Sequence, residues 1–383
     1  MERTKRDKRH DIIMFFLKPL VRVWMFFDMK HTYHFTEGFD PKRKTPYVLL
    51  GNHTFMFDVV HVPLPLKKVP FIVASHNLFV KQPTKFLLTR IAHAIPKTKS
   101  ASDIRTAREL IGAVKRGYPV CIFPEGNTTF NGETTYIEES TMKLIKKLEI
   151  DVVTVKVKGG YLSKPRWATG KRSNRTADFT YKIAISKEDI PNLSVEQIND
   201  IIKQELYHND YVYQREAMIP HPGKTLAEGI ENILYVCPEC DSIGTIETKG
   251  NSISCTHCNT TGVVNDYGFI EGFRFDNTVD WDNYQRQFDN QLQNHVITSP
   301  CTVQLVNDQT FEYVTLGTGT ITYKDHTFHI KTDNIVLTFA FEDIKTPIVT
   351  LRRDFNFNIG DKHYLVKIEQ YVSSFLRVVQ EKY

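Results

Sequence analysis

Two pairs of cysteines place the strongest constraint on how this chain can fold. Each pair reads C-x-x-C, and fourteen residues separate the first pair from the second. Four thiolates at this spacing can surround a tetrahedral zinc ion; two disulfides or an iron centre are the alternatives. A shell of four protein ligands is closed, so we expect a structural zinc and not a catalytic one. The expected ligands are Cys237, Cys240, Cys255 and Cys258.

The cysteine segment resembles a zinc ribbon, which we expect over residues 229–268. Zinc ribbons often bind nucleic acid. Residues 237–262, however, hold three acidic side chains against one lysine, and the whole chain of 383 residues carries a net charge of only +5. This balance argues against a nucleic-acid partner and favours an interaction or spacer role. The C-x-x-C pairs, without a cleavable signal pattern, indicate a reducing compartment.

The first thirty residues combine a basic tail with an apolar, aromatic-rich stretch. The stretch is shorter than a membrane span and contains Lys18, Pro19 and Arg22, so we predict no transmembrane helix. On a helical wheel Asp11, Lys18 and Arg22 fall near one face, and large apolar residues cover most of the remainder. This pattern predicts a helix over 1–30 that lies in the bilayer interface. An ordinary core helix with a solvated tail is the alternative.

Strand-like and helical segments then alternate over residues 31–228, as in an α/β domain. We expect strands at 46–52, 69–75, 118–126 and 151–160, and helices at 100–117, 137–148 and 194–206. The last helix begins with Ser194 and Gln197 at the spacing of a capping box.

A histidine and an aspartate, His53 and Asp58, follow the first of these strands. Residues five apart on one continuous helix point about 140° away from each other, so the two can meet only if His53 precedes the helix and Asp58 lies in its first turn. The carboxylate would then hold one ring nitrogen and leave the other free as a base. A local polar contact without catalytic meaning is the alternative.

A second polar segment, residues 121–134, follows the third strand. The strand ends in Pro124, Glu125 and Gly126 and opens into small polar residues that include Asn127 and Thr128. Glycine at a strand end lets backbone amides approach a ligand, and Asn and Thr side chains offer neutral donors to phosphate oxygens. Cys121 lies inside the strand, and we interpret it as a core residue and not as a nucleophile.

The motif H-x-x-x-x-D, followed roughly seventy residues later by F-P-E-G, resembles the glycerolipid acyltransferase family, most closely its 1-acylglycerol-3-phosphate acyltransferase members. The resemblance covers about residues 10–225 and implies a mixed sheet flanked by helices. It also implies direct transfer of an acyl group from acyl-CoA or acyl carrier protein to a lysophospholipid hydroxyl. His53 would be the general base, Asp58 would orient it, and no catalytic metal would take part.

The resemblance further implies that Glu125 and Gly126 belong to the site for the acceptor phosphate. The family's phosphate-binding arginine falls where this sequence has Lys97 or Lys99, which keep the charge but lose the bidentate fork. Thr128 stands near a position where many members have another arginine. Another lysophospholipid or a lipid-linked group is therefore an alternative acceptor, and a non-catalytic membrane-bound adaptor is an alternative function.

Residues 269–383 have a different pattern. Tryptophan, aromatic and leucine residues between 281 and 292 recur at helical spacing, which indicates a core helix. Short alternating segments then run from 300 to 368, and an amphipathic segment ends the chain. This arrangement resembles a small, mainly-β domain of the pleckstrin-homology type. Altogether we expect a peripheral enzyme on the cytoplasmic face of a membrane, with the ribbon and the β domain as accessory modules.

Overall fold

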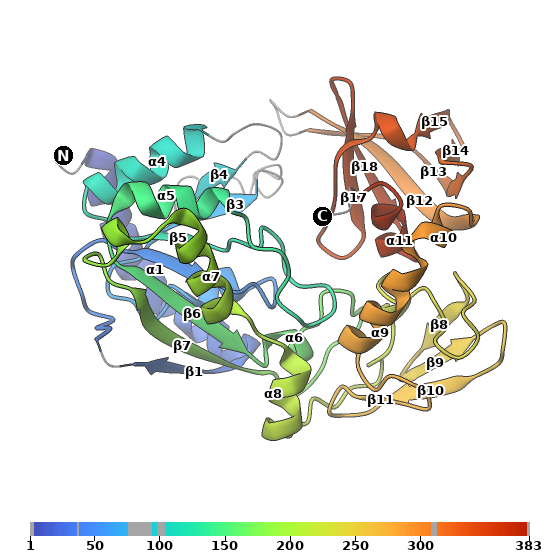
Figure 1. Cartoon of the computed structure of the whole chain (residues 1–383), viewed down its shortest axis with the longest axis horizontal. Helices are drawn as coiled ribbons and strands as arrows, with labels where there is room; N and C mark the ends of the chain where they lie inside the picture. The colour runs from blue at the N-terminus through green and yellow to red at the C-terminus, as the bar shows by residue number, and fades with distance from the viewer. Residues whose placement is uncertain (1–3, 37, 76–93, 98–103, 308–311, 381–383) are drawn as a thin grey trace. The chain divides into compact units, whose positions relative to one another are not determined.

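The computed structural model describes residues 4–36, 38–75, 94–97, 104–307 and 312–380 (Figure 1). The chain forms two compact units. Unit 1 comprises Met1–Thr129, Glu133–Ser163 and Asn174–Tyr213, and unit 2 comprises Phe130–Gly132, Lys164–Ser173 and Gln214–Tyr383. The four-part division expected from the sequence stays a prediction.

A seven-stranded mixed sheet forms the centre of unit 1, in the order β1-β7-β6-β2-β5-β3-β4. Strands β2 to β6 are parallel, β7 is antiparallel to β6, and β1 is parallel to β7. The α/β class and the mixed sheet are therefore as expected. The strands are β1 (Lys30–Phe35), β2 (Val48–Gly51), β3 (Phe71–Ser75), β4 (Ile95–Lys97), β5 (Val120–Ile122), β6 (Val152–Lys158) and β7 (Thr176–Ile185).

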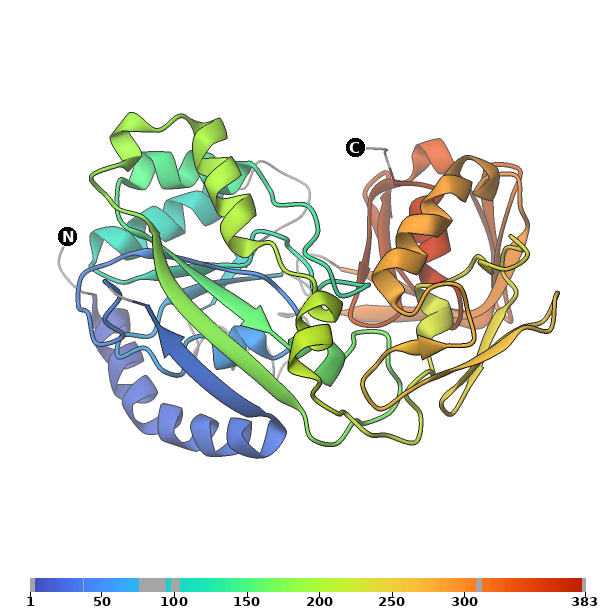
Figure 2. The same cartoon turned by 60° about the horizontal axis from the view of Figure 1, so that its bottom comes forward.

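Helices cover both faces of this sheet, and α1 lies on the opposite side from α4, α5 and α7 (Figure 2). Strand β2 contributes side chains to two apolar clusters. Val48 and Leu50 pack in one cluster, and Leu49 packs in the other. A parallel strand buried on both faces has to be apolar throughout, which explains its sequence. The helices of unit 1 are α1 (Lys5–Asp28), α2 (Asp58–His61), α4 (Ile104–Lys115), α5 (Ser140–Leu148), α6 (Gly160–Ser163), η3 (Ile190–Asn192) and α7 (Val195–Leu206).

Local sequence signals explain where the longer helices begin. Ser194 and Gln197 form the expected capping box at the start of α7, because each side chain accepts a hydrogen bond from the other residue's backbone N–H. Thr4 and Asp7 form a second capping box at the start of α1. Among the described residues, no helix has both the length and the hydropathy to cross a membrane.

The longest segment of unit 2 begins within α8 (Asp210–Ala217) and contains a small antiparallel sheet around the cysteines, in the order β11-β10-β9-β8. Its elements are η4 (Ile230–Asn232), β8 (Ile246–Lys249), β9 (Ser252–Cys255), β10 (Thr261–Val264) and β11 (Ile270–Glu271). The expected core helix follows in three pieces: α9 (Thr278–Gln285), a 3-10 turn η5 (Arg286–Phe288) and α10 (Asp289–Leu292). Trp281 and Leu292 are fully buried, in agreement with a core role.

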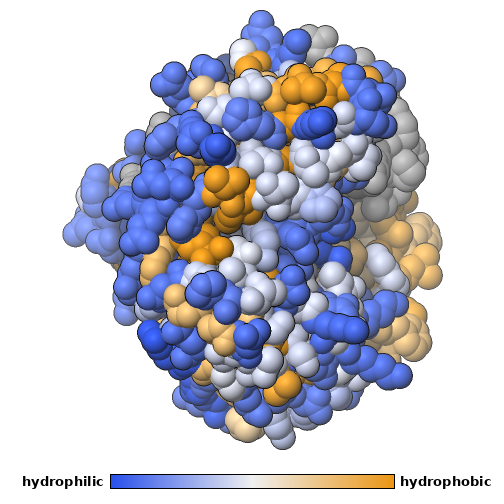
Figure 3. All heavy atoms as spheres, turned by 90° about the vertical axis from the view of Figure 1, so that its right-hand side faces the viewer, coloured by the Kyte–Doolittle hydropathy of each residue, from blue (hydrophilic) through white to orange (hydrophobic). Residues whose placement is uncertain are grey.

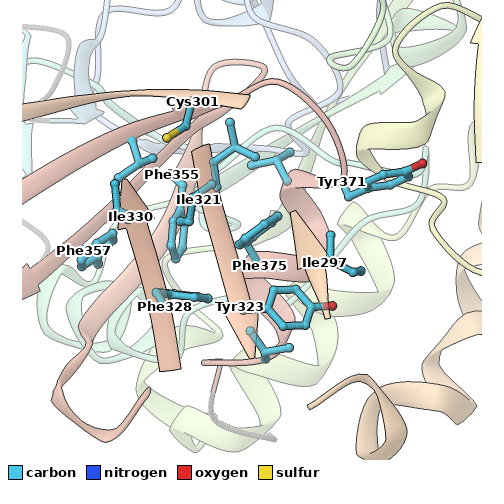
Figure 4. Close-up of a cluster of buried hydrophobic side chains, with 14 of the residues drawn as sticks. Ile297, Cys301, Ile321, Tyr323, Phe328, Ile330, Phe355, Phe357, Tyr371 and Phe375 are labelled. Carbon is cyan, nitrogen blue, oxygen red and sulfur yellow. The ribbon is translucent and has the colours of Figure 1, made fainter. Parts of the chain in front are cut away.

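A second seven-stranded sheet, antiparallel throughout, completes unit 2 in the order β15-β14-β13-β12-β18-β17-β16. Its strands and short helices are β12 (Ile297–Val306), β13 (Tyr313–Lys324), β14 (Thr327–Thr332), β15 (Val336–Ala340), η6 (Phe341–Asp343), β16 (Lys345–Thr350), β17 (Asp354–Ile359), β18 (Lys362–Ile368) and α11 (Val372–Arg377). Phe375 of α11 packs with Tyr323 and Phe328 inside the sheet (Figure 4). The mainly-β character is as expected, and the pleckstrin-homology resemblance stays a prediction.

Strand β13 runs through Gly317 without a break, and its pairing with β12 shifts register between Val303 and Gln304. A β-bulge at this point lets the glycine bend the strand without ending it.

On the side of unit 2 seen in Figure 3, hydrophilic residues cover most of the surface and apolar residues form small separate groups.

Candidate active site

His53 and Asp58 meet in the geometry that their spacing predicts. His53 follows β2, and Asp58 is the first residue of α2. His53 Nδ1 lies 2.9 Å from Asp58 Oδ2, the aspartate is fully buried, and the histidine side chain keeps 15% of its surface exposed. An ionised Asp58 requires the proton on Nδ1, which leaves Nε2 as an acceptor and therefore as a base.

The turn between the two residues is held by main-chain hydrogen bonds to the same carboxylate. Thr54 N and Phe55 N donate to Asp58 Oδ2 over 2.9 and 3.3 Å. The aspartate therefore organises the backbone of the turn as well as the imidazole. The His53 ring also packs on Phe123, with 4.7 Å between the ring centroids.

Glu125 bridges this turn to the loop that follows β5. Its Oε1 accepts from His53 N over 2.7 Å, and its Oε2 accepts from Thr135 N and Oγ1 over 2.9 and 3.1 Å. Burial raises the pKa of the Glu125 carboxyl, and the hydrogen bonds from Thr135 and His53 partly oppose that rise. The described contacts of this side chain are thus with protein groups, and its predicted role at the acceptor phosphate stays a prediction.

The other residues of the F-P-E-G loop lie beside this bridge. Thr129 N donates to His53 O over 2.9 Å, which fastens the loop to the turn between His53 and Asp58 a second time. Gly126 is exposed and has a φ of +70°, a left-handed conformation that favours glycine. Asn127 and Thr128 are partly buried. Of the two predicted lysines, Lys97 ends β4, and Lys99 lies outside the described residues.

Parallel strands place these residues at the same edge of the sheet. His53 follows β2, Glu125 follows β5 and Lys97 ends β4, so all three lie beyond or at carboxyl ends of parallel strands. Open α/β sheets bind their ligands at such edges. Sequence reasoning missed Asn52, whose amide bonds both N and O of Val157 and so ties the end of β2 to β6. Its one signal is a polar residue at the end of an apolar strand.

The segment that holds these residues is similar to known proteins. A family model described as Acyltransferase matches residues 31–158, a range that includes His53, Asp58 and Glu125. The chain contains an acyltransferase domain. A solved structure, the 1-acyl-sn-glycerophosphate (LPA) acyltransferase PlsC from Thermotoga maritima, is similar with a TM-score of 0.42 and 15% identity, over 53% of this chain and 80% of that one. A search of curated proteins finds no match.

The helix that precedes the acyltransferase domain is amphipathic in an unusual sense. Two of its charged side chains hydrogen-bond to the backbone of the segment after α2: Lys18 Nζ donates to Leu66 O, and Arg22 Nη2, of an otherwise exposed residue, donates to Leu64 O over 2.9 Å. Burial lowers the pKa of Lys18 to about 8. Its large apolar side chains point outward, with 54–76% of their surface exposed: Ile12, Phe15, Phe16, Leu20, Val23, Trp24, Phe26 and Phe27. A surface helix of a globular protein normally shows the reverse arrangement.

The four cysteines form a compact cluster in unit 2. All four Sγ atoms lie within 4.8 Å of one another, and the pairs Cys237–Cys258 and Cys240–Cys255 are each 3.8 Å apart. A tetrahedral zinc with Zn–S bonds of about 2.3 Å has sulfur atoms about 3.8 Å apart, so the donor set fits the metal. The two C-x-x-C turns have similar backbones, because the residue that follows each pair, Asp241 or Asn259, has a left-handed φ. In the described part of the chain this is the only candidate metal cluster of its kind.

Proposed function

We propose that this acyltransferase moves a fatty acyl group from an acyl thioester to the free hydroxyl of 1-acylglycerol 3-phosphate and so forms phosphatidic acid. The observation that carries the proposal is the His53–Asp58 pair, in which a fully buried carboxylate holds Nδ1 at 2.9 Å. An imidazole fixed in this way is suited to take a proton from a substrate hydroxyl. The matched acyltransferase family supplies the reaction class.

In the proposed reaction the acceptor's own oxygen is the nucleophile. His53 Nε2 takes the hydroxyl proton as the oxygen attacks the thioester carbonyl carbon, and Asp58 stabilises the imidazolium that forms. The tetrahedral intermediate then collapses, the C–S bond breaks, and the leaving thiolate takes the proton back from His53. No acyl-enzyme forms. Cys121 is the cysteine nearest to His53 in the sequence. It is fully buried, and burial raises the pKa of its thiol.

The acceptor phosphate would bind at the same edge of the sheet. We assign its charge to Lys97 or Lys99 and its neutral hydrogen bonds to the loop of Gly126, Asn127 and Thr128. Gly126 is exposed and carries no side chain, so the phosphate can approach the backbone there. A lysine binds phosphate as a point charge and without the fixed fork of arginine, which leaves room for another lysophospholipid as the acceptor.

The acyltransferase would sit on the membrane surface through α1. Lys18 and Arg22 hydrogen-bond to backbone carbonyls of the domain. The apolar face of this helix stays exposed, so it can enter the bilayer interface. The basic residues at its start, Lys5, Lys8 and Arg9, would meet anionic head groups. In unit 2, we assign a structural zinc to the cysteine cluster.

Acyl transfer by the purified protein on liposomes tests this function. The protein is mixed with vesicles that contain 1-acylglycerol 3-phosphate and supplied with acyl-CoA or with acyl carrier protein loaded with the same chain. We expect phosphatidic acid with one of the two donors. Product with a different lysophospholipid alone would retain the chemistry and change the acceptor. No product with any acceptor of a lysophospholipid panel would contradict the proposal and favour a non-catalytic adaptor.

A further inference from the structure

A second buried pair of imidazole and carboxylate lies outside the H-x-x-x-x-D motif. His208 Nε2 is 2.6 Å from Asp210 Oδ1, and the two side chains keep 8% and 0% of their surface exposed. Asp210 also accepts from the backbone: Gly159 N donates to Oδ1 over 2.7 Å, and Leu162 N donates to Oδ2 over 3.0 Å. The carboxylate therefore fixes the segment that follows β6.

That segment packs directly against the catalytic turn. The Cα of Gly160 faces Thr54 and Phe55, the two residues whose amides donate to Asp58. A Cβ on Gly160 would lie 2.7 Å from Phe55 Cδ1 and would also collide with Thr54 Oγ1. Contacts this short do not occur for real side chains, so the side chains of Thr54 and Phe55, or the turn that carries them, would have to shift. Gly160 thus packs closely against the turn, and the hydrogen bonds of Asp210 hold the Gly160 segment in place.

Residues 208–210, which hold the His208–Asp210 pair, also contact the other side of the site through the backbone of His208. Thr134 N donates to His208 O over 2.9 Å, and His208 N donates to Thr134 Oγ1 over 3.0 Å. The next residue, Thr135, donates twice to Glu125, which in turn accepts from His53 N. Residues 208–210 therefore support the catalytic turn on two sides: through the segment after β6 and through the F-P-E-G loop.

We propose that Asp210, acting through Gly160 and supported by His208, is a positioning residue for His53 and Asp58. It touches neither substrate nor reacting atoms. Its carboxylate sets where the backbone of the turn lies, and that backbone sets the distance from His53 Nε2 to the acceptor hydroxyl. Reaction rates respond steeply to displacements of this kind. The inference rests on the proposed function for its kinetic readout alone.

Asp210→Asn tests the inference, because the amide keeps the shape but turns a donor toward one of the two backbone N–H groups. We expect kcat to fall about tenfold or more while KM for the thioester changes less than about twofold. We also expect faster amide exchange in the peptide that covers residues 49–60, measured by mass spectrometry. This second readout does not depend on activity.

Asp151→Asn is the matched control. Asp151 precedes β6 at its opposite end and likewise accepts from a backbone amide, that of Lys187, and from Arg43. We expect this variant to lose stability without changing kcat or the exchange of residues 49–60. Gly160→Ala is the second test variant, and it carries the test if Asp210→Asn fails to fold.

The outcomes separate the two proposals. Unchanged kcat and unchanged exchange of residues 49–60 in a folded Asp210→Asn or Gly160→Ala variant would overturn the positioning role. Faster exchange of that peptide in a protein that transfers no acyl group to any acceptor would support the positioning role and contradict the proposed function.

Discussion

Three buried or partly buried carboxylates at the candidate site accept hydrogen bonds from the main chain. Asp58 accepts from the amides of the turn between His53 and Asp58, Glu125 accepts from His53 N, and Asp210 accepts from the amides that begin α6. Hydrogen bonds to an ionised acceptor are stronger than neutral ones, so each carboxylate can fix a backbone segment. A site assembled from loops gains precision from such supports.

Glu125 gives this arrangement a pH dependence. Burial holds the pKa of its carboxyl above the ordinary value of 4.5. Between the unfolded and the folded pKa the folded chain binds the additional proton, so raising the pH through that window lowers the stability of the folded state. We expect the free energy of unfolding of the wild type to fall, relative to that of Glu125→Gln, as the pH rises from about 4.5 through the raised pKa.

Denaturant unfolding of the two proteins across a pH series measures this difference. Glu139→Gln, at an exposed glutamate fourteen residues further along, controls for the removal of one charge. A stability difference between the wild type and Glu125→Gln that grows in favour of the wild type with rising pH would show that the hydrogen bonds outweigh burial.

At the scale of elements, the sequence predicted most of the acyltransferase domain. The buried parallel strands were recognisable as apolar runs, and the capping box marked the start of α7 correctly. The His53–Asp58 contact was also predictable, because spacing allows it in one geometry only. Asn52, Gly160 and Asp210 were not, because each acts on a backbone segment far away in the sequence or through a close approach that only the fold creates.

Helix α1 is the element whose exposure most needs an explanation. Replacing two of its outward residues, Phe16 and Leu20, with serine removes apolar surface that would enter the bilayer. Each such side chain contributes roughly 1.5–3 kcal/mol when buried, so we expect the double variant to bind liposomes at least about tenfold more weakly. Co-sedimentation with anionic vesicles measures the binding.

Val336→Ser is the control for this experiment, since Val336 is an equally exposed apolar residue on β15 of unit 2. It should bind vesicles like the wild type. Equal binding by the α1 double variant would show that another surface holds the protein on the membrane.

At the scale of the whole molecule, the chain joins an acyltransferase domain to a unit with its own cluster of four cysteines and its own core. The second core is built largely from aromatic and β-branched residues of the antiparallel sheet and closed by α11 (Figure 4). Its strands were predictable from alternation, but the bulge at Gly317 was not, because a glycine in a strand can mark a turn or a bulge equally well.

The zinc assignment predicts how unit 2 responds to chelation. Metal binding energy is folding energy for a small ribbon, so removing the metal should loosen β8 to β11. We expect one zinc per chain by elemental analysis, and its loss in Cys240→Ser together with faster amide exchange over residues 237–262. Cys301→Ser, at a buried cysteine outside the cluster, should keep the metal. A chain that purifies without metal and shows unchanged exchange after chelation would contradict the assignment.

The most direct test of the account is the rate of acyl transfer by His53→Ala on liposomes that contain the acceptor. His34→Ala is the matched control, because His34 is exposed on β1 of the same domain. A positioned general base contributes about 100- to 10,000-fold, so we expect a loss of that size in His53→Ala and a wild-type rate in His34→Ala. A folded His53→Ala protein that transfers acyl groups at the wild-type rate would contradict the role of His53 and the mechanism built on it.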